Sequence, residues 1–81
     1  MVRTLVATAN VDIDGRTYPM QYYVQQTVRG SRRYSCEVLL GAEDRIIVDD
    51  DSMMGLESKV MRLAPATVYS RLLAARSSEA A

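Results

Sequence analysis

Residues 5–24, LVATANVDIDGRTYPMQYYV, decide the fold of this chain. Apolar side chains recur at every second position on both sides of Asp14-Gly15, which is the pattern of strands with one buried face. The dipeptide favours a two-residue type I′ turn, because that turn requires a positive φ at both central residues. The stretch therefore predicts a β-hairpin.

The two-residue turn determines which residues stand opposite one another in this hairpin, beginning with Ile13 and Arg16. Small side chains then meet large ones on the apolar face, which favours cross-strand packing. The expected apolar pairs are Val11–Tyr18, Ala9–Met20, Ala7–Tyr22 and Leu5–Val24. On the polar face the same register places Val6 opposite Tyr23.

A third strand is predicted by further alternation, with the inward residues Tyr34, Cys36, Val38 and Leu40. A three-residue loop at residues 30–32 keeps this strand in phase with the hairpin. The resulting pairs are Val24–Val38, Tyr22–Leu40 and Tyr23–Leu39. Residues 45–48, after a loop at residues 41–44, predict a short fourth strand of the meander.

The acidic run Asp49-Asp50-Asp51, followed by Ser52, is expected to end this strand and to cap a helix. From Met53 the apolar residues are spaced by three and four: Leu56, Val60, Leu63, Ala64, Val68, Leu72 and Ala75. Pro65 interrupts the pattern, since proline lacks a backbone donor and clashes with the preceding turn. The alternatives are one helix kinked near residues 61–65 and two helices.

The predicted fold class is α+β. A three- to four-stranded antiparallel β-meander is followed by a C-terminal helical segment, kinked or split at Pro65, that packs on one face of the sheet. The 81 residues suit one domain, expected at residues 1–76, with a frayed tail at residues 77–81. No apolar run has the length of a membrane span, so we expect a cytoplasmic protein without membrane contact.

The composition argues against several kinds of catalysis. The chain has no histidine, which removes the usual general base near neutral pH and the commonest metal ligand. Cys36 therefore has no histidine to activate it, and we expect it to be a buried structural thiol. The acidic run at residues 49–51 could hold a cation, but a role as helix cap is favoured. We expect no enzyme, no metal and no cofactor.

Two surfaces are candidates for binding. The outer face of the sheet is mostly polar, and the expected register places Val6, Tyr23 and Leu39 in one row across three strands. Such an apolar row would suit a contact with another protein chain. The alternative surface is the hairpin tip with Arg29, Arg32 and Arg33, which could grip phosphates beside a stacking tyrosine.

We therefore expect a small noncatalytic protein-binding or regulatory module, for example a regulator or inhibitor of the phage or mobile-element type. Its partner would be another protein or its own second subunit. The alternative function is single-stranded nucleic-acid binding through residues 29–33. The predicted order of strands and helix resembles that of coactivators that bind single-stranded nucleic acid, a likeness of architecture that transfers no residue. Ten basic residues balance ten acidic ones, so no net positive field favours nucleic acid.

Overall fold

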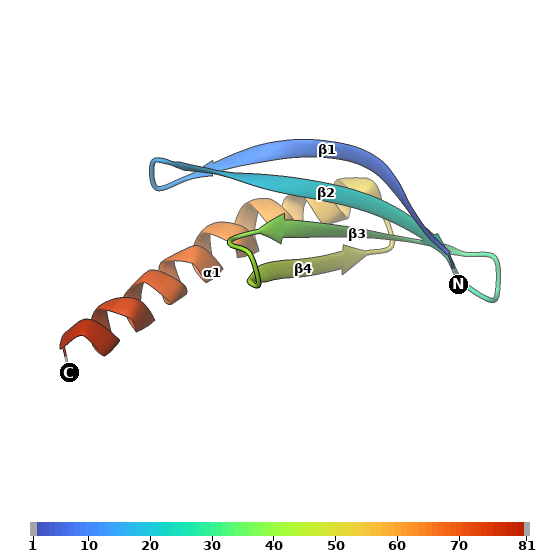
Figure 1. Ribbon diagram of the computed structural model, residues 1–81. Helices are drawn as coiled ribbons and strands as arrows, with labels where there is room; N and C mark the ends of the chain where they lie inside the picture. Colours follow the sequence, from blue (N-terminus) through green and yellow to red (C-terminus); the bar gives the residue numbers. More distant parts are fainter. Residues whose placement is uncertain (1, 81) are drawn as a thin grey trace.

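The computed structural model describes residues 2–80, and the side chains of residues 2–76. Its elements are β1 (Arg3–Ile13), β2 (Arg16–Gln26), β3 (Arg32–Leu39), β4 (Arg45–Asp50) and α1 (Met53–Ala80). The strands form one antiparallel sheet in the order β1-β2-β3-β4, and α1 crosses one face of it (Figure 1). The predicted α+β meander is confirmed with all four strands. The division at residue 76 stays a prediction, and Ala81 lies outside the described residues.

The hairpin between β1 and β2 forms as predicted. Asp14 has a φ of 52° and Gly15 a φ of 78°, as a type I′ turn requires. The pairs from Ile13–Arg16 to Ala7–Tyr22 follow the expected register. The alternation of the sequence and the chemistry of its turn are therefore sufficient for this part of the sheet.

A bulge in β1 overturns the expected register beyond Ala7. The pairing shifts between Leu5 and Ala7, so that Leu5 stands opposite Tyr23 and Thr4 opposite Val24. The predicted pairs Leu5–Val24 and Val6–Tyr23 are wrong. The bulge inserts one extra residue into β1, and this turns Leu5 from the inner to the outer face.

The register between β2 and β3 also differs from the prediction. Tyr22 stands opposite Cys36, Val24 opposite Tyr34 and Tyr23 opposite Ser35, so the predicted Val24–Val38, Tyr22–Leu40 and Tyr23–Leu39 pairs are wrong. The connecting loop spans residues 27–31 and is closed by a hydrogen bond from the Thr27 amide to the Ser31 carbonyl (2.7 Å). The shift is even, so the predicted inner face of β3 is retained.

The start of α1 confirms the predicted cap. The Ser52 hydroxyl accepts a hydrogen bond from the Gly55 amide (3.0 Å), and the Asp50 carboxylate accepts one from the Ser52 amide (3.1 Å). Lys59 forms an ion pair with the same carboxylate (3.0 Å). Asp50 therefore joins the end of β4 to the first two turns of the helix.

α1 is a single helix of 28 residues with Pro65 inside it, so the alternative of two helices is wrong. Pro65 cannot donate to the carbonyl of Met61. Both residues are exposed, Met61 by 66%, so this carbonyl can be hydrated. Two residues further on, the Thr67 hydroxyl donates to the Leu63 carbonyl (2.8 Å). The proline therefore costs one hydrogen bond without ending the helix.

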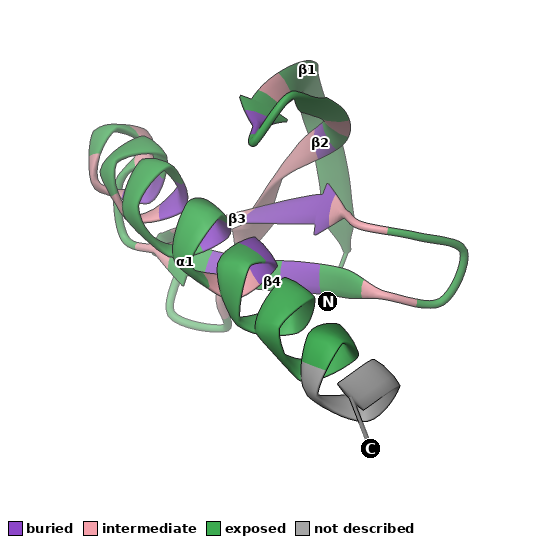
Figure 2. Ribbon diagram, turned by 90° about the vertical axis from the view of Figure 1, so that its left-hand side faces the viewer, coloured by how far each residue is buried: buried purple, intermediate pink, exposed green. Residues whose placement is uncertain are grey.

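The core lies between α1 and the β3–β4 half of the sheet. α1 contacts β4 and β3, and the buried residues gather there (Figure 2). The buried apolar residues are Ile13, Met20, Cys36, Val38, Ile46, Val48, Leu56, Val60, Ala64 and Val68. The expectation that Leu5, Ala7 and Ala9 also belong to this core is wrong, since all three are exposed. No described part of α1 covers Ala7 and Ala9 on the inner face of β1, whereas Ile13, at the end of the same strand, belongs to the core.

Gly55 provides a test of the junction between β4 and α1. A Cβ at this position would lie 2.7 Å from Oδ1 of Asp50 and 2.9 Å from the hydroxyl oxygen of Ser52. We expect Gly55→Ala to lower the free energy of unfolding by about 1–3 kcal/mol in urea denaturation, because the cap must move.

The matched control is Ser58→Ala, at an exposed position in the same helix, which should leave stability unchanged or slightly raised. An increase in stability for Gly55→Ala would contradict this account, because alanine normally favours a helix over glycine by ~1 kcal/mol.

Candidate functional site

The structure separates the three residues of the predicted outer row. Tyr23 lies between Leu5 and Ser35, whereas Leu39 pairs with Arg45 at the far end of β3. Val6 lies in the β1 bulge and is 49% exposed. The geometric argument for a continuous apolar row is therefore wrong, and any role of these residues in binding stays a prediction.

Tyr23 is covered by its own chain. The guanidinium of Arg3 lies 4.0 Å from the centre of the Tyr23 ring, which is a cation–π contact. The phenol hydroxyl donates to the side-chain carbonyl of Gln21 (2.9 Å). Stacking of a base or an aromatic side chain on this ring would first require Arg3 to move.

Arg3 also reaches Glu37, a buried acid on the outer face of the sheet. No pattern in the sequence had indicated a role for this residue. Glu37 is 3% exposed and accepts hydrogen bonds from Arg45 (2.8 Å) and Arg3 (3.1 Å). The hydrogen bond from Arg45 and the charge of Arg3 hold the pKa of this carboxyl below its usual range, against the effect of burial. The three side chains link β1, β3 and β4.

Glu37 predicts a dependence of stability on pH. Its folded-state pKa is lowered, so its contribution is complete above the ordinary value of 4.5 and is lost as the pH falls through the folded-state value. We expect Glu37→Gln to cost about 1 kcal/mol at neutral pH, since solvent screens the half-exposed arginines. The measurement is urea denaturation of both proteins from pH 7 downward. A difference that stays constant below pH 4.5 would contradict this role.

The arginines at the tip of the β2–β3 hairpin do not act as a group. Arg33 pairs with Asp49 and Asp51 on the neighbouring strand end. Arg29, in the loop, and Arg32, the first residue of β3, are exposed. Tyr34 belongs to the inner face and packs against the core. The acidic run is therefore occupied by a cap and by ion pairs. Among the side chains that the structure describes, residues 2–76, no cluster of acidic, cysteine or histidine groups is arranged to hold a metal ion.

Cys36 is fully buried, as predicted for a structural thiol. It stands opposite Tyr22 on the inner face. Burial raises the pKa of the Cys36 thiol to about 11, and burial together with Cys36 raises the pKa of Tyr22 to about 12. Both groups are neutral at physiological pH, and a neutral thiol is a poor nucleophile.

The burial of Cys36 predicts that the native protein resists thiol reagents. We expect a chromogenic disulfide reagent at neutral pH to modify Cys36 at least ~100-fold more slowly in native protein than in urea, because reaction requires unfolding. A fast reaction without denaturant would show that the thiol is accessible and would reopen a chemical role.

The sheet has two edge strands, β1 and β4, and β1 is the longer one, with 11 residues against six. Residues 3–10 of β1 are exposed. In a hairpin with a two-residue turn, the pairs that exchange hydrogen bonds include Ile13–Arg16 and every second pair beyond it. The backbone groups of Thr8, Asn10 and Asp12 therefore point away from β2. β1 contains no lysine or proline, residues that protect many natural edges.

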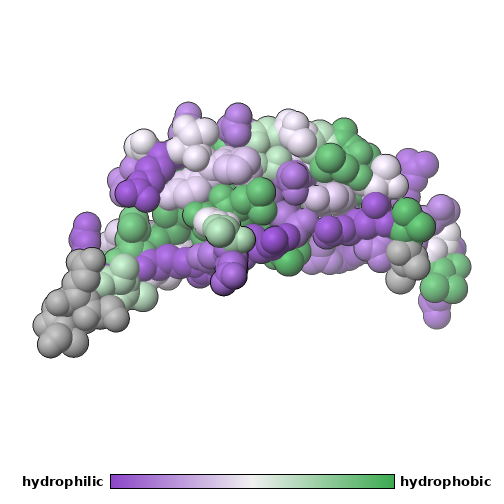
Figure 3. Space-filling view, viewed as in Figure 1, coloured by the Kyte–Doolittle hydropathy of each residue, from purple (hydrophilic) through white to green (hydrophobic). Residues whose placement is uncertain are grey.

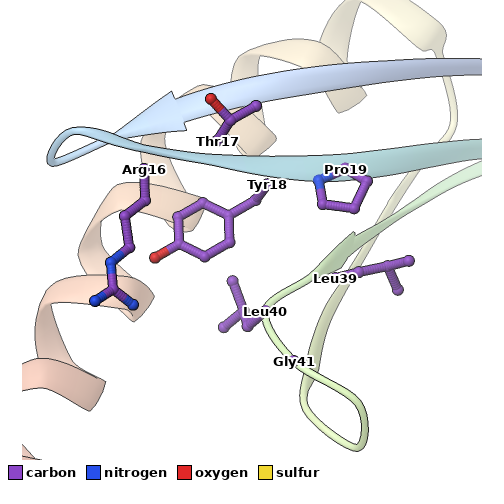
Figure 4. A pocket seen from close by; sticks show the side chains of 7 residues that line it. All are labelled: Arg16, Thr17, Tyr18, Pro19, Leu39, Leu40 and Gly41. Carbon is purple, nitrogen blue, oxygen red and sulfur yellow. The ribbon is translucent and has the colours of Figure 1, made fainter.

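Two hollows adjoin the turn end of this hairpin. One, of about 540 Å³, opens between β2 and the end of β3, where Tyr18 and Leu40 approach each other beside Arg16 (Figure 4). The other, of about 480 Å³, is a groove between the hairpin and the C-terminal half of α1. Its lining is Ile13, Asp14, Pro65, Val68, Tyr69, Leu72 and Arg76. Both are open and mainly apolar, which suits a macromolecular contact better than a reaction.

Comparison with known protein families, with curated proteins and with solved structures found no match to this chain. In the described residues, α1 lacks the sustained apolar stretch that a membrane-crossing helix needs.

Proposed function

We propose that this chain is a noncatalytic protein-binding module that presents the edge of β1 to a protein partner. The observation that carries this proposal is the edge strand of 11 residues, whose outward backbone groups no element within residues 2–80 pairs with. An exposed edge of this kind recruits an extended segment of another chain by strand addition. The partner is another protein or a second subunit of the same chain.

The two faces of β1 would supply selectivity. Ala7 and Ala9 are exposed on the inner face, and Thr8, Asn10 and Asp12 are on the outer face. In strand addition the main chain supplies most of the affinity, and alternate side chains select the partner. The added strand would therefore be apolar on the helix side and polar on the other.

The chemistry of the chain supports a role without catalysis. Histidine is absent, the one thiol is buried with a raised pKa, and Glu37 is held between two arginines. A cytoplasmic regulator or inhibitor, of the kind that phages and mobile elements encode, would act by occupying a surface of its partner. The rival function, single-stranded nucleic-acid binding, would rest on Arg29 and Arg32 alone, since Arg33 is paired.

The test compares an edge variant with a charge variant. Asn10→Pro removes an outward donor of β1 and no hydrogen bond to β2. Arg29→Glu with Arg32→Glu reverses the charge at the hairpin tip. Partners are copurified from cells that contain two differently tagged copies of the chain, so that self-association is also detected. Each partner is then purified and titrated, and the β1 amides are followed by hydrogen exchange.

We expect Asn10→Pro to weaken partner binding at least ~10-fold, or ~1.4 kcal/mol, with an unchanged circular dichroism spectrum. The partner should protect the amides of Thr8, Asn10 and Asp12, and the charge variant should bind normally. Equal binding by the edge variant would refute the proposal. Tight binding of a single-stranded oligonucleotide that falls steeply with salt, and that the charge variant loses, would support the rival function instead.

A further inference from the structure

We propose that the partner of the β1 edge is a second copy of this chain, paired with it antiparallel about a two-fold axis at Asn10. The two four-stranded sheets would then form one continuous sheet of twice the width, with both helices on the same side. This inference rests on the proposed function and names the occupant of the same edge.

The symmetry of the contact restricts its register. A two-fold axis perpendicular to the sheet makes the two β1 strands antiparallel and keeps their inner faces on one side. Residues that exchange hydrogen bonds must have outward backbone groups in both copies. Thr8, Asn10 and Asp12 meet this condition. With the axis at Asn10, each Asn10 faces its counterpart, and each Thr8 faces Asp12 of the second copy.

The side chains agree with this register on both faces. On the inner face Ala9 would stand opposite Val11 of the second copy, and Ala7 opposite Ile13, so that small residues again meet large ones. On the outer face the Thr8 hydroxyl would donate to Asp12 of the second copy. Asp12 accepts a bond from Thr17 through Oδ1 (2.5 Å), and its second carboxylate oxygen can accept this further bond.

The bulge selects the position of the axis. Residues 7–13 form the uninterrupted part of β1 between the bulge and the Asp14-Gly15 turn. An axis at Asn10 uses all of these residues and none beyond them. An axis at Thr8 would bring Leu5 opposite Val11 of the second copy, although the bulge has turned Leu5 to the other face. The copy-to-copy register centred on Asn10 avoids this conflict.

The helix provides apolar surface for the same contact. On α1 the exposed Tyr69 (63%), Leu73 (43%) and Leu72 (37%) follow the buried Val68. Tyr69 and Leu72 line the groove that begins at Ile13, and hydrophobic side chains lie between the hairpin and α1 on this side of the molecule (Figure 3). Because Ile13 would lie beside Ala7 of the second copy, this part of α1 would adjoin the second copy's uncovered inner face.

The size and charge of the contact are compatible with a second copy. A strand edge of seven residues is about 24 Å long. By itself it would bury less surface area than the ~800 Å² per partner of a stable interface. The exposed apolar residues of α1 supply additional area on the same side. Ten basic residues balance ten acidic ones, so two copies do not repel each other through net charge.

The experiment uses the purified full chain and analytical ultracentrifugation over a range of concentrations. Wild type should sediment as a particle of twice the 9.0 kDa chain mass. Ala9→Lys places a charge at the centre of the contact, at a residue that is exposed in the isolated chain. Asn10→Pro removes the central hydrogen bonds. We expect both variants to raise the dissociation constant at least ~10-fold with unchanged circular dichroism. Ala42→Lys, at an exposed alanine outside the contact, should dimerise like wild type.

Cross-linking then tests the register. A short bismaleimide should join two copies of Asn10→Cys, because the two-fold axis brings position 10 of both copies together, but not two copies of Ala42→Cys. The native Cys36 is buried and should not react. A wild-type monomer at all concentrations would overturn the inference, and so would a dimer that both β1 variants retain. If the chain is a monomer but another protein protects the β1 amides, the proposed function survives. If Asn10→Pro changes neither self-association nor any partner's binding, both proposals fail.

Discussion

The packing of one helical row against half of the sheet governs the rest of this structure. Leu56, Val60, Ala64 and Val68 are spaced by four residues and are all buried. Such a row is inclined to the helix axis, and it lies on β3 and β4, where the cap at Ser52 starts the helix. The core is consequently narrow, and within the described residues no layer covers Ala7 and Ala9 on the inner face of β1. The open edge and the bare alanines of β1 follow from this one placement.

The outer face of the sheet is held by charges of the chain itself. Glu37 bridges Arg3 and Arg45, and Arg33 pairs with two residues of the acidic run. The pair of Arg3 with Glu37 connects strands that are distant in sequence, and Arg3 also covers the ring of Tyr23. A face whose polar groups are already paired offers little to a partner, since each pair would have to be desolvated again. The outward backbone groups of the β1 edge face solvent, and an added strand would replace their hydrogen bonds to water with direct ones, so the binding surface is expected there.

The loop between β2 and β3 shows what residue alternation can predict and what it cannot. Alternation predicted which residues of β3 face inward, and it was right, because period two depends only on the local backbone. It could not predict the length of the loop, because several loops preserve the same parity. With the observed loop at residues 27–31, Tyr23 stands opposite Ser35 instead of Leu39, so the expected row does not form. The buried pairing of Glu37 was missed because it depends on the register of three strands, and one of its arginines, Arg3, lies 34 residues away in the chain.

The sequence by itself determined the hairpin at Asp14-Gly15, the order of strands and helix, the inward faces of β2 and β3 and the cap at Ser52. Each of these depends on residues within a few positions of one another, where turn chemistry and side-chain period act directly. Only the tertiary structure decided the bulge in β1, the offset of β3, the continuity of α1 through Pro65 and the exposure of Ala7 and Ala9. These depend on how far each element extends over its neighbours, because burial is shared between segments that no local pattern connects.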